Sequence, residues 1–283
     1  MLFPSSVGPP DERITMNTVT SRDGTRIAFT RTGEGPAMIL VDGAMCVRGA
    51  GPSDALAAEL ASAFTVYTYD RRGRGESTDA RHPDTGGTAE EWARASVEAE
   101  VDDLVALVGH AGGNAHVFGH SSGAILALEA SLRGAGITGL ALFEPPPAGG
   151  DADAELLERL RELVRAGRRG EAVEAFQAAI GLPQEMIAGM RESPFRAVLE
   201  GIAPTLAYDT AVANGGDPAR YAGVTAPVLV LDSEASPGLL RTACRDMAEA
   251  VPGAVRRSLP GGFHDVEAGV MGPALIEFFG KAG

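Results

Sequence analysis

The sequence predicts an α/β fold on a mostly parallel sheet, with a helical insertion in the second half of the chain. Short apolar runs alternate with helical segments up to about residue 144 and again after residue 226, which is the pattern of strand–helix–strand units. Between these parts the alternation stops, because residues 145–225 hold several helical patterns and no convincing strand. We therefore expect a core domain from residues 1–144 and 226–283, with residues 145–225 inserted as a helical cap.

Eight segments have the length and composition of strands. They are residues 16–20, 26–31, 37–41, 65–69, 115–118, 139–143, 227–231 and 254–259. The first two are joined by the turn Asp23-Gly24, which predicts an antiparallel hairpin. The remaining strands are separated by helical segments, so we expect them to be parallel.

Helices are predicted between the strands from apolar positions that recur on one face. In residues 54–64, Leu56, Leu60 and Phe64 are four apart. Further core helices are expected at residues 97–108, 122–132, 239–250 and 271–279. The cap has two apolar stripes of helical spacing: Leu156, Leu157, Leu160, Leu163 and Val164, and then Val173, Phe176 and Ile180.

Composition indicates an ordinary globular protein. Of the 283 residues 45% are hydrophobic and 22% charged, so a sizeable core can be buried. The formal charge of −14 repels polyanions, which argues against a nucleic-acid partner. No apolar run is long enough to cross a membrane, and the start of the chain does not have the pattern of a secretory signal. Cys46 and Cys244 are far apart and are interpreted as free thiols, so we expect a cytoplasmic protein.

A Gly-His-Ser-Ser-Gly sequence at residues 119–123 lies between a predicted strand and a predicted helix. In this context a G-x-S-x-G sequence forms a sharp turn that projects the serine hydroxyl above the carboxyl end of the sheet. Small residues on both sides allow close backbone approach, and the helix N-terminus offers the N–H of Ser122 to a developing oxyanion. The motif alone is weak, because such strings also form ordinary turns. In this position it makes Ser121 the candidate nucleophile.

A second marker is the segment Tyr-Asp-Arg-Arg-Gly-Arg-Gly-Glu-Ser at residues 69–77, which is similar to the D-x-R-G-x-G-x-S loop of many α/β-hydrolases. With the elbow, it makes residues 16–280 resemble the α/β-hydrolase fold family. The resemblance implies an eight-stranded, mostly parallel sheet flanked by helices, a helical cap, and catalytic residues in the order Ser, acid, His. It also implies that Asp70 and Arg72 are structural, on a solvated loop. The alternative is that the arginines of this loop bind an anionic substrate.

A serine hydroxyl needs a base that titrates near neutral pH, and histidine is suitable. His264 follows the last predicted strand and precedes the terminal helix, which is where the resemblance places the base. The other four histidines are interpreted as structural or solvated: His82, His110, His116 and His120, the last of which lies within the elbow.

The oxyanion hole needs two N–H donors. Relatives carry His-Gly after the third strand, whereas this chain has Asp42-Gly43, followed by Ala44. We expect the N–H groups of Ala44 and Ser122 to form the hole. Asp42 is interpreted as bracing its loop by accepting backbone hydrogen bonds. If it faces the site instead, it would oppose an oxyanion.

The acid of the expected triad has several candidates. The position where the resemblance places it, after the seventh strand, holds Ser236. Some members place the acid after the sixth strand, where this chain has Glu144. We favour Glu144 as the residue that orients the imidazole, with Asp232 as its main competitor; Glu234 or a Ser–His dyad stay open.

These residues predict a serine hydrolase that cleaves a carboxylic ester, lactone or thioester of a small, largely apolar substrate through an acyl-enzyme. A serine in the elbow, rather than aspartate, disfavours dehalogenase and epoxide-hydrolase chemistry. The cap supplies five apolar residues that suggest an apolar substrate pocket: Met186, Met190, Phe195, Leu199 and Ile202. The alternative is that these residues pack the cap on itself.

The rival hypothesis is a ligand-binding protein, or a non-hydrolytic lyase or cyclase of a biosynthetic route, because Ser236 and Asp42 depart from the family pattern. No cofactor is expected, since Gly33-x-Gly35 precedes a strand instead of following one, and no metal site is expected. We expect a small-molecule substrate as partner, no nucleic acid and no membrane, and we leave a homodimer open.

Overall fold

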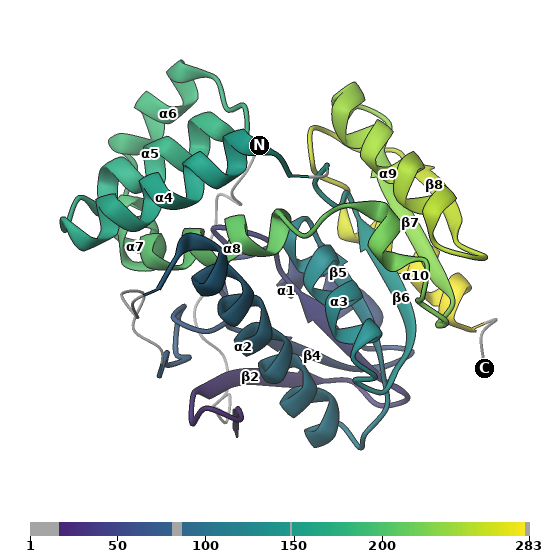
Figure 1. Cartoon of the computed structure of the whole chain (residues 1–283). Helices are drawn as coiled ribbons and strands as arrows, with labels where there is room; N and C mark the ends of the chain where they lie inside the picture. The colour runs from purple at the N-terminus through teal and green to yellow at the C-terminus, as the bar shows by residue number, and fades with distance from the viewer. Residues whose placement is uncertain (1–16, 81–86, 148, 281–283) are drawn as a thin grey trace.

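The computed structural model describes residues 17–80, 87–147 and 149–280. Its centre is one eight-stranded sheet in the order β1-β2-β4-β3-β5-β6-β7-β8 (Figure 1). The strands are β1 (Asn17–Thr20), β2 (Arg26–Thr32), β3 (Ala37–Val41), β4 (Thr65–Tyr69), β5 (Ala115–His120), β6 (Ile137–Phe143), β7 (Val228–Ser233) and β8 (Val255–Leu259). Strand β2 is antiparallel to both of its neighbours, and all other pairs are parallel. The predicted fold class is confirmed.

Alternate residues of the central strands enter two separate hydrophobic cores. On β3, Ile39 and Val41 join one cluster, whereas Met38 and Leu40 join the other. Strands buried on both faces read as continuous apolar runs, which is how these segments appear in the sequence. Both faces must therefore be covered by helices.

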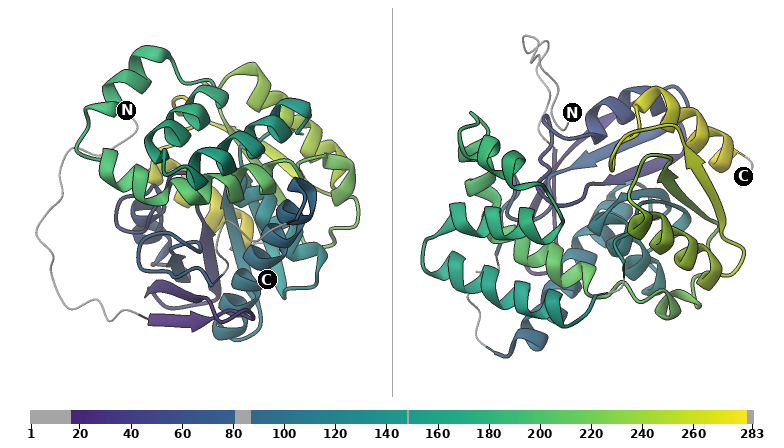
Figure 2. Two further views of the ribbon diagram at one scale, coloured as in Figure 1. Left: turned by 60° about the vertical axis from the view of Figure 1, so that its left-hand side comes forward. Right: turned by 90° about the horizontal axis from the view of Figure 1, so that it is seen from above.

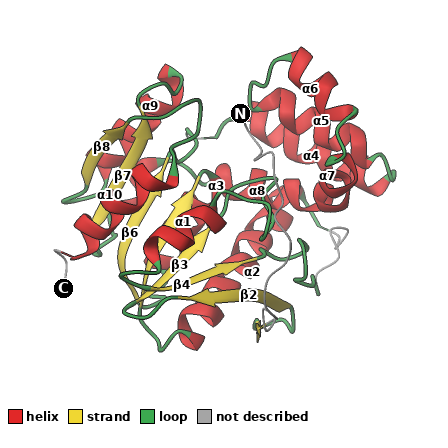
Figure 3. Ribbon diagram, turned by 180° about the vertical axis from the view of Figure 1, so that it is seen from behind, coloured by secondary structure: helices red, strands yellow, loops and turns green. Residues whose placement is uncertain are grey.

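The helices divide between the two faces. Helices α2 (Ala89–His110), α3 (Ser122–Leu132) and α9 (Gly238–Ala250) supply buried residues to the first cluster and lie over the sheet in Figure 1. Helices α1 (Ser53–Leu60) and α10 (Ala268–Gly280) supply the second cluster and cover the opposite face in Figure 3. Within the described ranges, no helix combines the length and apolar character needed to cross a membrane.

A helical insertion joins β6 to β7. It contains α4 (Asp151–Arg165), α5 (Arg169–Ala179), α6 (Gln184–Arg191), α7 (Arg196–Ile202) and α8 (Leu206–Ala213), with short 3-10 turns at η1 (Ala203–Thr205) and η2 (Pro218–Tyr221). Figure 2 shows helices α4 to α7 grouped together beside the sheet and its flanking helices. The insertion has its own core, in which Leu160, Val173 and Tyr208 are buried.

The insertion packs on the rest of the molecule around Trp92, near the start of α2. The Trp92 ring is stacked on Tyr208 of α8, with ring centroids 5.2 Å apart, and Arg161 of α4 lies over the same indole. Of the first apolar stripe, Leu157, Leu160 and Leu163 are buried and Leu156 and Val164 are partly buried; Val173 and Phe176 of the second stripe are buried. Ile180 is different, because it is 47% exposed beyond the end of α5.

The largest differences between expected and observed boundaries lie in helices α1 and α2. Helix α2 begins at Ala89 rather than near residue 97, because Thr88 and Glu91 form a capping box that starts the helix earlier. Helix α1 ends at Leu60 rather than at residue 64. Met16, the first residue of the first expected strand, and His82 lie outside the described residues.

Candidate active site

Ser121 stands at the sharp turn between β5 and α3. Its backbone has φ 55° and ψ −122°, a conformation that is costly for a residue with a side chain. The turn is held from the neighbouring strand, because the Ser121 N–H donates to the Phe143 carbonyl at 2.9 Å. The geometry is that of the strained elbow that the sequence predicts.

The two glycines of the motif are required by close backbone contacts. A Cβ on Gly119 would lie 2.5 Å from the Gly123 carbonyl oxygen, and a Cβ on Gly123 would lie 2.2 Å from that of Val41. Neither distance leaves room for a side chain. The turn therefore packs α3 directly against the ends of β3 and β5.

His264 is brought to the same edge of the sheet by the loop after β8. The Gly262 N–H donates to Asp265 O at 2.8 Å, which closes a tight turn with His264 at φ 50°. The imidazole lies beside the elbow: its ring centroid is 4.6 Å from that of His120. The hydroxyl of Ser121 forms no hydrogen bond with another described residue, so the pairing of Ser121 with His264 belongs to the functional proposal below.

Glu144 is the carboxylate that His264 contacts. Its Oε2 lies 2.5 Å from His264 Nδ1, and its Oε1 accepts the Ser233 N–H at 2.8 Å. The side chain is fully buried directly after β6, where the backbone has φ 45°. A carboxylate in this place fixes the imidazole ring and favours the tautomer that leaves Nε2 free to accept a proton.

The surroundings keep Glu144 ionised. Burial alone would raise the pKa of its carboxyl group, but the hydrogen bonds from His264, Ser236 and the Ser233 N–H outweigh burial and hold the pKa below its usual value. The Ser236 hydroxyl also accepts the backbone N–H of His264 at 3.1 Å. The residue that replaces the acid of the family pattern thus contacts both the backbone of His264 and the carboxylate of Glu144.

The two competing acids point to other partners. Asp232 is fully buried, but its Oδ2 accepts from Arg256 and its Oδ1 accepts from the Ser258 hydroxyl, both on β8. Glu234 is exposed at the start of the loop after β7. Of the three carboxylates considered from the sequence, Glu144 is the one in contact with the imidazole.

Ala44 and Ser122 lie on the two segments that meet at the elbow. A Cβ on Gly43 would be 3.0 Å from the Ser121 Cβ and from the His120 carbonyl oxygen, so the two segments are in direct contact. Neither the Ala44 N–H nor the Ser122 N–H donates to another described residue. Neither group is therefore engaged by a described residue, and their role as oxyanion donors belongs to the functional proposal below.

Asp42 differs from its expected role. Its carboxylate accepts the hydroxyl proton of Ser53, at the start of α1, at 2.6 Å, and not a backbone N–H. It is buried, and burial raises its pKa from 3.8 to about 6, although the Ser53 hydrogen bond works against this shift. The carboxylate is thus tied to α1 by a side-chain hydrogen bond.

The interpretation of residues 69–77 as a solvated loop is wrong. Arg71, Arg72 and Arg74 are each at most 2% exposed, and carboxylates surround them. Arg71 pairs with Glu100 and Asp209, Arg72 with Asp103, and Arg74 with Asp209. Such pairs explain how three arginines are accommodated in the interior, and they leave none of the three exposed to an anionic substrate. The structural role expected for Arg72 agrees with its contacts.

Asp209 has no motif in the sequence. The available signal is that it is the one charged residue in α8, LAYDTAVA, since an ionised residue in an otherwise apolar helix needs a partner. The partner could not be identified from spacing, because Arg71 lies 138 positions away.

The remaining histidines lie apart from the carboxylate. His116 Nδ1 is 3.1 Å from the Thr138 hydroxyl, and the His110 ring packs on Phe29. His120 packs against both Phe143 and His264, and burial together with a charged His264 lowers its pKa well below the ordinary value. It is therefore a neutral neighbour of the site.

The fold and this arrangement define an α/β-hydrolase, and the comparison with known families agrees. Residues 45–268 match the family described as "Alpha/beta hydrolase family", so the chain belongs to that family. An α/β hydrolase from Sphaerobacter thermophilus DSM 20745 is 42% identical with a TM-score of 0.80, over 93% of this chain and 100% of that one.

Two further similarities are weaker. The Bacillus subtilis (strain 168) protein named "Uncharacterized hydrolase YraK" is 34% identical over 114 residues, which are 39% of this chain and 37% of that protein. The chain therefore matches little more than a third of that relative. A thermophilic esterase from Thermogutta terrifontis shares the fold, with 24% identity and a TM-score of 0.70 over 95% of this chain and 99% of that one.

Proposed function

We propose that this α/β-hydrolase is a serine hydrolase that cleaves a carboxylic ester, lactone or thioester of a small, largely apolar substrate. The observation that carries the proposal is the contact of 2.5 Å between His264 Nδ1 and the buried Glu144 carboxylate, beside the strained elbow of Ser121. An imidazole held in this way has the tautomer needed by a general base. Membership of the family and the similarity to named hydrolases support the same class of reaction.

The proposed reaction begins when the Ser121 hydroxyl attacks the substrate carbonyl and His264 Nε2 takes its proton. The tetrahedral intermediate places its negative oxygen between the N–H groups of Ala44 and Ser122. The protonated imidazole then gives its proton to the leaving oxygen or sulfur, and an ester of Ser121 forms. A water molecule, deprotonated by His264, attacks this ester; the acid is released as the imidazolium returns the proton to Ser121 Oγ. Glu144 stays ionised throughout and stabilises the imidazolium.

We further propose that helices α4 to α8 act as a cap over this site. Leu199 and Ile202 are buried in the core of the insertion, so these two of the five apolar cap residues pack the cap on itself. Met190 is only partly buried, and Met186 is 42% exposed. We therefore assign contacts with the acyl group of the substrate to the less buried residues Met186 and Met190.

A p-nitrophenyl ester series tests the proposal, with wild type and Ser121→Ala compared at each chain length. We expect turnover by wild type, covalent labelling of Ser121 by a fluorophosphonate, and loss of both in the variant. A removed nucleophile typically costs about 10⁶ in kcat, so the residual rate should be near background. A folded wild-type protein that neither hydrolyses the series nor labels would favour the ligand-binding alternative. Labelling without hydrolysis would instead favour a lyase or cyclase, which product analysis would identify.

A further inference from the structure

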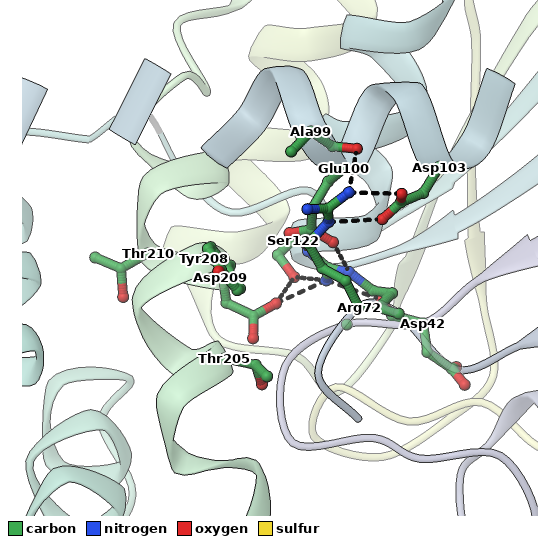
Figure 4. A network of polar contacts seen from close by, with 12 residues as sticks. Asp42, Arg72, Ala99, Glu100, Asp103, Ser122, Thr205, Tyr208, Asp209 and Thr210 are labelled. Carbon is green, nitrogen blue, oxygen red and sulfur yellow. Dashed lines mark hydrogen bonds and ion pairs between the residues drawn. The ribbon is translucent and has the colours of Figure 1, made fainter. Parts of the chain in front are cut away.

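Helix α8 of the insertion brings a carboxylate into the interior, next to the elbow. Asp209 is 1% exposed, and its side chain points from α8 toward Ser122 (Figure 4). Its Oδ1 accepts from the Ser122 hydroxyl and from Arg71 Nη1, each at 2.7 Å, and its Oδ2 accepts from Arg74 Nη2 at 2.5 Å. One carboxylate thus has three donors, and one of them belongs to the elbow itself.

The same two arginines hold the other oxyanion segment by its carbonyl groups. Arg74 Nη1 donates to Gly43 O at 2.7 Å and to Cys46 O at 3.3 Å, on either side of Ala44. Arg71 Nη1 donates to Asp42 O at 3.2 Å. Because the peptide N–H of Ala44 shares its plane with the Gly43 carbonyl, a contact to that carbonyl oxygen orients the N–H.

The charges in this cluster are balanced. Arg71 is bound by Glu100 on its other side, so two guanidinium groups face two carboxylates. Burial alone would raise the pKa of Asp209, but Arg74 and Arg71 outweigh it and hold the pKa below the ordinary value. Removing the Asp209 charge would leave a buried positive charge that no carboxylate balances.

We propose that Asp209 is a positioning residue of the oxyanion hole: from the insertion, it fixes the Ser122 N–H through the Ser122 hydroxyl and the Ala44 N–H through Arg74. This inference rests on the proposed function, and it makes α8 part of the catalytic geometry. Its physical basis is that an N–H donor contributes to the rate only when it is held at the place where the oxyanion forms.

Asp209→Asn tests this, because it keeps the shape and removes the charge. We expect kcat for a p-nitrophenyl ester to fall about 10- to 100-fold, since small displacements of a donor are costly, while KM changes less than about threefold. A trifluoromethyl ketone, whose adduct with a serine carries an oxyanion, should lose affinity by a similar factor. Ser122→Ala keeps the backbone N–H and loses only the hydrogen bond from its hydroxyl to Asp209. Its effect on kcat should therefore be smaller, about 3- to 10-fold.

Asp103→Asn is the matched control. Asp103 is also 1% exposed and pairs with an arginine of the same loop, but Arg72 forms no hydrogen bond or ion pair with residues 42–46 or 121–122. Asp209→Asn and Asp103→Asn should both lower the melting temperature, so all rates are measured well below the lowest melting temperature among the proteins compared. The control should keep the kcat and the ketone affinity of wild type.

The outcomes separate the two proposals. If Asp209→Asn lowers the melting temperature as Asp103→Asn does but keeps kcat and ketone affinity, its role is structural and the positioning proposal is wrong. A drop in kcat of the same size in the control has the same consequence. A wild type that neither hydrolyses esters nor reacts with a fluorophosphonate overturns the proposed function, and the positioning role with it.

Discussion

Glu144 occupies the position from which a carboxylate directs the proposed base. Glu144→Gln replaces an acceptor-only group by an amide, which no longer stabilises the imidazolium and can favour the wrong tautomer. We expect kcat to fall by up to about 10⁴-fold with little change in KM, because the loss is felt mainly in the transition state. Steady-state hydrolysis of a short p-nitrophenyl ester measures this.

Asp232→Asn is the matched variant for the acid. It also neutralises a fully buried carboxylate, but that carboxylate is bound to Arg256 and Ser258 of β8. We expect a lower melting temperature with kcat close to that of wild type. The assignment of Glu144 is wrong if Asp232→Asn abolishes turnover while Glu144→Gln keeps it.

Asp42 gives a pH dependence of stability. Its folded pKa of about 6 lies above the ordinary value of 3.8, so the folded state binds this proton more tightly than the unfolded state. The contribution of Asp42 to stability is therefore most favourable below pH 4, and it is lost as pH rises through 6. The shift corresponds to about 3 kcal/mol at pH 7.

Asp42→Asn should remove this dependence. The free energy of unfolding, measured with urea at several pH values, should favour the variant over wild type by about 2.4 kcal/mol more at pH 7 than at pH 4. Ser53 keeps a side-chain acceptor in the variant, so the hydrogen bond is preserved. A difference between the two proteins that does not vary with pH would contradict the raised pKa.

The site could be predicted from the sequence where a residue is tied to a turn or a strand end. Ser121, His264 and Glu144 each follow a predicted strand, so the topology alone places them at one edge of the sheet. Asp209 could not be found in this way, because its partners come from a distant loop and an elbow. Ion pairs and hydrogen bonds that form only through tertiary packing leave no local pattern in the sequence.

At the scale of single elements, the contact between α3 and β3 depends on Gly123. Gly123→Ala would place a methyl group 2.2 Å from the Val41 carbonyl oxygen, against backbone that cannot rotate away. We expect the free energy of unfolding to fall by about 1–3 kcal/mol or more, as for other overpacked sites. Chemical denaturation measures this, and activity should fall as well, since the elbow must move.

Gly109→Ala is the control for this substitution. Gly109 lies in α2, and a Cβ there would meet no atom within 4 Å. Alanine has the higher helix propensity, so stability should stay the same or rise by up to about 1 kcal/mol. If both substitutions destabilise equally, the close approach at the elbow is not the cause.

Most elements of the core could be predicted because their strands are buried on both faces. The strands β3 and β4 have the expected bounds, as does α3. The start of α2 could not be predicted in this way, because the first turns of this helix pack against the insertion rather than against the sheet. Trp92, in these turns, packs on Tyr208. The path of the insertion depends on contacts of this kind, which periodicity along one helix does not reveal.

At the scale of the whole molecule, the contacts between the insertion and the core predict how the protein unfolds. Helix α8 is bound to the core by the buried cluster of Asp209, Arg71 and Arg74, and by the stacking of Tyr208 on Trp92. Both contacts break if the insertion separates from the core. We therefore expect that the insertion and the core unfold together in one transition.

Trp92 makes this measurable, because it is the single tryptophan of the chain and lies at the contact with the insertion. Its fluorescence reports the separation of α8 from α2, whereas far-UV circular dichroism reports the loss of helices and strands throughout. In urea the two signals should have the same midpoint and the same slope. If the fluorescence changes at a lower urea concentration than the circular dichroism, the insertion separates from the core before the core unfolds. The Asp209 carboxylate would then contact the elbow only part of the time.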